Sequence, residues 1–195
     1  MYEGAVAHYQ ATGKKTFLDI AIKNADLICR EFAPGKQQSP PGHQEIEIGL
    51  CKLYRVTGDK KYLDLAKFLI DIRGRPETHK LYGAYSQDHK PVVEQNEAVG
   101  HAVRAVYLYS GMADVAALTG DEAYIKAIDK IWENIVFKKL YLTGGIGARH
   151  AGEAFGGNYE LPNKSAYNET CAAIANGLLN HRMFLLHGDS KYLDV

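Results

Sequence analysis

A short motif recurs four times along this chain of 195 residues, and it limits the fold more than any other feature. Each copy has a glycine after an apolar run, then a charged turn, then an aromatic residue four positions after the glycine. Glycine commonly ends helices, because it adopts the left-handed backbone conformation at little cost. The motif therefore predicts helical hairpins in which the aromatic side chain packs between the two helices. The four pairs are Gly13 and Phe17, Gly58 and Tyr62, Gly120 and Tyr124, and Gly188 and Tyr192.

The spacing of the hairpins indicates a ring rather than a regular superhelix. Successive glycines are 45, 62 and 68 residues apart, whereas helical solenoids repeat at a fixed interval. The extra length falls in two loops, residues 76–95 and 137–164, which are positioned to build a site at one rim. We therefore expect an all-α chain that forms part of an (α/α)6 toroid. The second loop is rich in glycine, and we expect it to be irregular apart from a short β-hairpin around Leu140–Thr143.

Both ends of the sequence fall inside the repeat pattern. The chain opens on a helical run without a capping residue, and its last motif stops at Val195, about one turn into a helix. We therefore expect residues 1–195 to be four of the six hairpins of a catalytic barrel, with the remainder of the barrel outside this sequence. The uncovered apolar helix faces of such an open ring predict self-association.

The composition excludes several kinds of partner. The 23 basic residues balance 23 acidic ones and are scattered, which is unlike a nucleic-acid binder. No run approaches the roughly 18 apolar residues of a membrane span, and no basic region followed by an apolar stretch marks export. Three widely spaced cysteines argue against a disulfide framework, so a reducing, cytoplasmic compartment is the default expectation. An uncharged ligand fits this charge balance best.

Three polar residues are candidates for chemistry. His101 begins the most apolar helical run, residues 97–120, where a lone histidine is more often a hydrogen-bonded core residue than a functional one. Arg104, one turn later, favours a functional role, because buried polar groups need partners. Glu153 lies in a glycine-flanked loop, and His43 lies ahead of a predicted helix. By residue pattern alone, a solvated carboxylate and a capping or surface histidine are the simpler interpretations of these two.

A carboxylate and a thiol two positions apart, Glu169 and Cys171, precede another apolar helical run. Side chains at i and i+2 point to different faces of a helix, and they converge only on an extended or first-turn backbone. A zinc site needs about four ligands, or three with an open position, and this pair supplies two. Cys29 and Cys51 lie in apolar helical runs, where cysteine behaves as a small hydrophobic residue. The spacing leaves a metal site and a simple helix start as alternatives.

Three long segments resemble glycoside hydrolase family 127, the β-L-arabinofuranosidase-type enzymes. The segments are GHQEIEIGLCKLYRVTGDKKYLDLAKFLIDIRG, VGHAVRAVYLYSGMADVAALTGD and YLTGGIGARHAGEAFGGNYELPNKSAYNETCAAI, and the likeness runs from end to end of the chain. The resemblance implies the catalytic (α/α)6 barrel of a zinc-dependent retaining glycosidase, followed by β-sandwich domains. The implied substrate is a carbohydrate, either a β-linked L-arabinofuranoside or a related plant-glycan sugar.

The resemblance also implies roles for individual residues. The glutamate of the GEAFG-type loop, here Glu153, is the general acid/base in that family. The Glu-Thr-Cys segment, here Glu169 and Cys171, supplies two zinc ligands, and the histidines of GHAVR and GHQE, here His101 and His43, belong to the sugar pocket. Family members take two further cysteines, one of them the nucleophile, from a later segment. This sequence has no later cysteine, so we expect the 195-residue chain alone to hold zinc weakly and to be inactive.

Two functions of other kinds are alternatives. A toroid carbohydrate epimerase or lyase would use His43, His101 and His150 as acid/base groups without a metal. In a helical-repeat binding module the same residues would be structural, and His101, Glu153 and Glu169 would not cluster. The glycosidase interpretation predicts instead that these last three residues face one cavity at the same rim of the ring.

Overall fold

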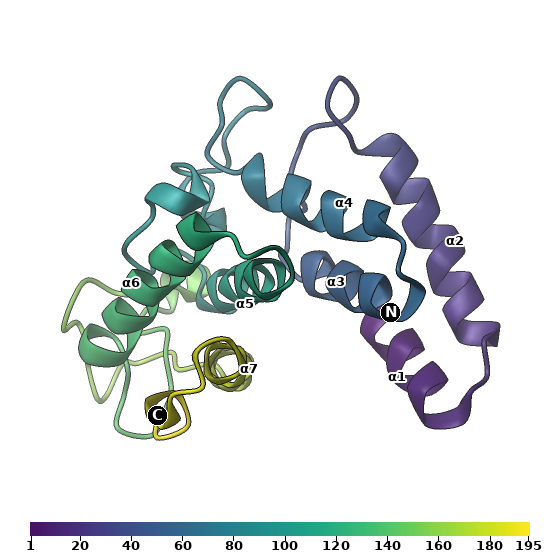
Figure 1. Ribbon diagram of the computed structural model, residues 1–195. Helices are drawn as coiled ribbons and strands as arrows, with labels where there is room; N and C mark the ends of the chain where they lie inside the picture. Colours follow the sequence, from purple (N-terminus) through teal and green to yellow (C-terminus); the bar gives the residue numbers. More distant parts are fainter.

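The computed structural model describes all 195 residues and contains seven α-helices (Figure 1). Their bounds are α1 Tyr2–Thr12, α2 Thr16–Glu31, α3 Ile46–Thr57, α4 Lys60–Asp71, α5 Ala102–Thr119, α6 Glu122–Lys138 and α7 Thr170–His187. Short 3-10 turns follow or join them at Ala84–Ser86, Val92–Glu94, Ala151–Glu153 and Ser190–Tyr192. No helix is both long enough and apolar enough to cross a membrane.

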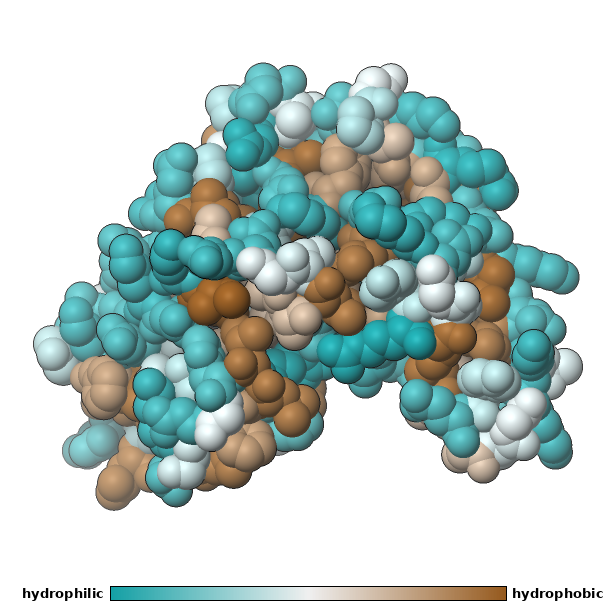
Figure 2. All heavy atoms as spheres, viewed as in Figure 1, coloured by the Kyte–Doolittle hydropathy of each residue, from teal (hydrophilic) through white to brown (hydrophobic).

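The helices form two curved layers. Helices α1, α3, α5 and α7 pack side by side in an inner layer, and α2, α4 and α6 cover its convex side (Figure 1). Each of the first three inner helices forms a hairpin with the outer helix that follows it. The space-filling view shows the concave side of this arc as a notch between the α1 and α7 limbs (Figure 2). The arrangement confirms the partial helical toroid that the repeat predicts.

A continuous core of buried side chains fills the space between the two layers. Helix α5 lies at its centre, and twelve of its 18 residues are buried. This confirms the expectation that the helical run without a polar face is an interior helix.

Each repeat glycine ends a helix as predicted. The φ angles are 70° at Gly13, 71° at Gly58, 73° at Gly120 and 70° at Gly188, all in the left-handed region. In each case the glycine N–H donates to the carbonyl four residues earlier. A side chain at such a position would strain the backbone. The glycines therefore fix where the chain turns back.

Three of the four repeat aromatics are buried, as expected. The Tyr62 hydroxyl on α4 donates to Asp26 Oδ1 on α2 at 2.7 Å, and the Tyr124 hydroxyl on α6 donates to Asp71 Oδ1 on α4 at 2.7 Å. The aromatic rings therefore fill the core while their hydroxyls tie neighbouring outer helices together. Tyr192 is buried as well.

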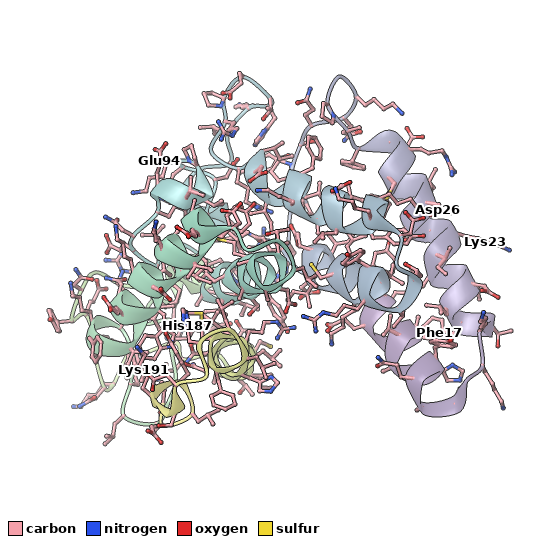
Figure 3. All side chains as sticks on the ribbon, in the orientation of Figure 1. Phe17, Lys23, Asp26, Glu94, His187 and Lys191 are labelled. Carbon is pink, nitrogen blue, oxygen red and sulfur yellow. The ribbon has the colours of Figure 1, made fainter.

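The fourth aromatic, Phe17, departs from this pattern. Its ring lies between α1 and α2 (Figure 3), 6.4 Å from the His8 ring, but 36% of the residue is exposed. Phe17 sits at the end of the arc, where no further helix covers it. The packing that the motif predicts is therefore only partly present there.

The β-hairpin predicted around Leu140–Thr143 is wrong. The Tyr141 N–H donates to the Gly145 carbonyl at 2.9 Å and the Gly144 N–H donates to the Tyr141 carbonyl at 2.8 Å, which closes a tight turn. Leu142 is fully exposed at its tip while Leu140 packs against the core, so the two leucines do not form the shared apolar face that a hairpin would bury. The chain contains isolated β-bridges but no strands.

Candidate active site

The N-terminal ends of the inner helices carry the predicted site residues at one rim of the arc, except Glu153, which ends the 3-10 turn Ala151–Glu153. His101 is the residue before α5, Glu169 is the residue before α7, and His43 lies three residues ahead of α3. The N-terminus of a helix carries partial positive charge, which favours carboxylates nearby. The hairpin repeat thus brings residues from distant parts of the sequence to one electrostatically favourable place.

Three of the predicted site residues converge. His101, Glu153 and Glu169 each have one atom that could bind a metal ion, and these three atoms lie within 4.8 Å of one another. His101 Nε2 is 2.9 Å from Glu153 Oε2. The three side chains therefore lie together, as expected, and that they face one cavity stays a prediction. The same convergence argues against a binding module in which these residues are only structural.

The hydrogen bonds of His101 define which of its ring nitrogens carries the proton. Its Nδ1 accepts a hydrogen bond of 3.3 Å from the Arg104 backbone N–H. Since an accepting ring nitrogen carries no proton, the neutral ring bears its proton on Nε2 and donates it to Glu153 Oε2. Burial lowers the pKa of His101, although the hydrogen bond to Glu153 acts in the opposite direction. Neutral His101 is therefore a donor toward the site.

Glu153 is held by its loop and by a tyrosine. Arg149 and Ala154 exchange two backbone hydrogen bonds of 3.0 Å, which close the loop around it. Glu153 has a φ of 49°, an uncommon conformation for a residue with a side chain. The Tyr167 hydroxyl donates to Glu153 Oε1 at 3.0 Å. The side chain is still 44% exposed, so its carboxylate is both oriented and accessible.

Sequence reasoning missed Tyr167. The chain has 13 tyrosines, most of them at helical spacing, and that pattern indicates core residues. The available signal was its place between the Glu153 loop and the start of α7, two residues before Glu169. A tyrosine there lies outside any apolar periodicity.

Glu169 and Cys171 come together because the helix starts between them. Glu169 has φ −59° and ψ 135°, outside the helix, whereas Cys171 is in the first turn of α7. A hydrogen bond to the Glu169 carboxylate is the largest cause of the raised pKa of the Cys171 thiol. Glu169 Oε2 is buried and has no hydrogen-bond partner. A carboxylate oxygen and a sulfur so placed suit zinc, which binds both ligand types.

His43 and two further side chains complete this part of the rim. The centres of the His43 and Tyr85 rings lie 6.0 Å and 5.6 Å, respectively, from the centre of the His101 ring. The Arg104 guanidinium is 4.9 Å from the centre of the Tyr85 ring and donates to the Gly42 carbonyl. Such a wall of rings with polar edges suits a ligand that has both apolar faces and hydroxyl groups.

Comparisons with known proteins agree on one family. The family model described as Beta-L-arabinofuranosidase, GH127 catalytic domain, matches residues 1–195. A non-reducing end β-L-arabinofuranosidase of Bifidobacterium longum subsp. longum is 40% identical over 213 residues, which cover 99% of this chain and 32% of that protein.

Two solved structures match equally well in shape. A GH127 β-arabinofuranosidase has a TM-score of 0.93 and 70% identity, over 99% of this chain and 30% of that one. A GH127 β-L-arabinofuranosidase from Geobacillus stearothermophilus T6 has a TM-score of 0.93 and 44% identity, over 99% of this chain and 33% of that one.

The partial helical toroid, the cluster of Glu153, Glu169 and His101 at its rim, and the similarity to solved GH127 structures together define a chain of the glycoside hydrolase class. The chain belongs to the GH127 β-L-arabinofuranosidase catalytic-domain family. It spans about a third of the length of the relatives it matches. Family membership favours glycoside hydrolysis over the epimerase or lyase alternative that would use His43, His101 and His150.

Proposed function

We propose that this chain carries part of the active site of a retaining, zinc-dependent glycoside hydrolase acting on β-L-arabinofuranosides or related plant-glycan linkages. The observation that supports it most is the convergence of His101, Glu153 and Glu169 within 4.8 Å in a chain of the GH127 family. The substrate class is supported by relatives that are named β-L-arabinofuranosidases.

Glu153 is the general acid/base in this proposal. It is the accessible carboxylate of the cluster, and His101 and Tyr167 orient its two oxygens. When protonated, Glu153 gives its proton to the departing glycosidic oxygen, while the cysteine nucleophile that the family resemblance implies in a later segment bonds to the anomeric carbon. As a carboxylate, Glu153 then takes a proton from the water that attacks the same carbon and displaces that cysteine. Two successive displacements at one carbon leave its configuration unchanged.

His101 and His43 bind the sugar. A furanose offers hydroxyl groups and carbon–hydrogen faces but no charge, so imidazole rings that present an apolar face beside polar edges match it. The side chain of His43 is 39% exposed, and its ring stands 6.0 Å from that of His101. The two rings therefore border the space beside Glu153 where the sugar would lie.

Glu169 and Cys171 hold the zinc ion. The buried, unpartnered oxygen of Glu169 and the thiol beside it support this assignment. When bound, zinc would supply the positive charge that keeps a coordinating cysteine ionised at neutral pH. Glu169 and Cys171 alone do not complete a zinc site. His101 and Glu153 lie within 4.8 Å of Glu169 but serve the sugar in this proposal, so the remaining ligands are the later cysteines that the family resemblance implies.

The test uses the complete protein that carries this chain. We expect it to release p-nitrophenol from the β-L-arabinofuranoside but not from the α-anomer, and proton NMR should show the β-sugar as the first product. Elemental analysis should find stoichiometric zinc, and a chelator should remove activity until zinc is returned. An α-product would contradict retention, and full activity without metal would contradict the zinc requirement. Inactivity on every β-L-arabinofuranoside would contradict the substrate class.

A further inference from the structure

We propose that Gln87 is a positioning residue that sets the spacing between the loop carrying His43 and the loop carrying His101. Its consequence for catalysis rests on the proposed function, in which both histidines bind the sugar. The contacts that support the proposal are independent of that function.

One end of the Gln87 side chain holds the loop of His101. Gln87 is fully buried, and its Nε2 lies 2.8 Å from the Val99 carbonyl, 3.2 Å from that of Tyr85 and 3.3 Å from that of His101. An amide nitrogen has two hydrogens, so these three carbonyl oxygens share both. Two of the three belong to ring-bearing residues of the rim. The amide thus fixes the backbone that carries the His101 and Tyr85 rings.

The other end of the same amide reaches the loop of His43. Gln87 Oε1 accepts a hydrogen bond of 2.7 Å from Gln44 Nε2, and Gln44 is also fully buried. Gln44 directly follows His43 in the chain, and its Nε2 also donates to the Ser86 carbonyl at 2.9 Å. A pair of buried amides therefore connects two loops that the sequence separates by more than forty residues.

A third buried side chain strengthens the junction without reaching the histidines. Arg73 donates to the Ser86 carbonyl at 3.0 Å and to the Pro41 carbonyl at 3.1 Å. It ties the same two loops together but has no hydrogen bond to either histidine. Gln87 is the residue that bonds directly to the His101 carbonyl and to the neighbour of His43. Both polar atoms of the Gln87 side chain have hydrogen-bond partners, whereas Gln44 Oε1 and Arg73 Nε are buried without one. Gln87 is therefore the satisfied group at the centre of this junction, and the spacing of the rings follows from its amide.

The chain offers a matched control in Gln95. It is also buried, and its Nε2 donates to the carbonyls of Gln87 and Lys90, each at 2.9 Å. Its side chain bonds to the Gln87 backbone but not to the Gln87 side-chain amide, nor to His43 or His101. Gln95→Met therefore removes a comparable buried amide from the same network without releasing the rings.

The first experiment measures ring positions directly. We would record NMR spectra of the 195-residue chain with isotope-labelled histidine side chains. Gln87→Met should shift the ring signals of both His43 and His101 and lower the Tm. Gln95→Met should lower the Tm and leave both sets of signals in place. Unchanged ring signals in Gln87→Met, or equal shifts in Gln95→Met, would overturn the positioning role.

A second variant covers the case in which Gln87→Met does not fold. Gln44→Met cuts the link to His43 but leaves the bonds from Gln87 to the His101 loop. It should shift the His43 ring signals and leave those of His101 close to wild type. Unmoved His43 signals in this variant would overturn the proposal as well.

Kinetics of the complete protein test the consequence for the sugar pocket. Gln87→Met should raise KM about tenfold and lower kcat less, since small displacements of binding groups weaken productive binding. Gln95→Met should leave both constants unchanged. Unchanged constants in Gln87→Met would overturn this consequence. If the wild-type protein cleaves no β-L-arabinofuranoside, the proposed function fails, and the NMR spectra still decide the role of Gln87.

Discussion

Glu153 and Glu169 lie close together, yet their surroundings differ. Glu153 accepts hydrogen bonds from His101 and Tyr167, one at each oxygen. Glu169 has a thiol beside it and a buried oxygen without a partner. A carboxylate with neutral donors and access to solvent suits proton transfer, whereas one with an unmatched buried oxygen suits a cation. Glutamine, which keeps the shape but removes the charge and the acid, should separate the two roles.

Glu153→Gln in the complete protein is expected to keep its zinc and lose turnover of glycosides with poor leaving groups. The amide cannot donate a proton to the departing oxygen, and positioned acid/base groups contribute about 10²–10⁴-fold to rate. A p-nitrophenyl leaving group needs little protonation and should restore part of the rate. Elemental analysis and kcat/KM on both kinds of substrate would measure this.

Glu169→Gln is expected to lose zinc, because a neutral amide oxygen is a poorer ligand than a carboxylate. Activity should fall with it on both kinds of substrate, without rescue by p-nitrophenol as leaving group. The same assays as for Glu153→Gln compare the two variants directly. If both kept their zinc and both were rescued alike, the separate roles of the two glutamates would be wrong.

Among the elements, the helices were predictable from sequence and the loops were not. Glycine ends a helix through its own backbone, so Gly58 and Gly120 mark their hairpins whatever surrounds them. The contact of His101 with Glu153 depends on the loop that carries Glu153, which passes beside the N-terminus of α5. There Ala154 pairs with His101 in an isolated β-bridge. No periodicity encodes that contact, and the roles of both residues came from family resemblance.

The buried glutamines show the same limit. Gln44 and Gln87 lie in loops, and a glutamine in a loop is normally expected to be exposed to solvent. Their burial results from two loops meeting, which is a property of the tertiary structure. Local patterns therefore located the hairpins, and distant contacts built the site.

A pair of glycine substitutions tests the element that repeats. Gly120 has φ 73° and open space around its Cα, so Gly120→Ala should destabilise the 195-residue chain by about 1–2 kcal/mol through backbone strain alone. Gly177 lies inside α7, also with open space, and Gly177→Ala should stabilise the chain by about 0.5–1 kcal/mol. Urea unfolding would measure both. Effects of the same sign would contradict the capping role of the repeat glycines.

The whole arc brings together the rim residues, and in the proposed function it supplies two ligands, Glu169 and Cys171, to a zinc site. We expect the isolated 195-residue chain to bind zinc weakly and to lack arabinofuranosidase activity, because Glu169 and Cys171 cannot complete a tetrahedral site. Elemental analysis after dialysis and a p-nitrophenyl glycoside assay would check this. Tightly held, stoichiometric zinc would contradict it.

The two limbs of the arc present apolar side chains to solvent. Ile20 on α2 is 58% exposed, and Ile174 and Leu185 on α7 are 60% and 67% exposed. Ile174 and Leu185 are eleven residues apart, about three helical turns, and so share one face of α7. Apolar faces of this kind seldom stay uncovered on a monomer. The isolated chain should therefore self-associate and bind a hydrophobic dye.

Substitution on the α7 face locates the contact. Ile174→Glu with Leu185→Glu should shift the chain toward monomer in sedimentation velocity and reduce dye fluorescence, because charges on that face oppose its burial. Leu142→Glu is the matched control, since Leu142 is fully exposed at a loop tip away from any helix face, and it should change neither property. A wild-type chain that sediments as a monomer and binds no dye would show that the arc covers these faces itself.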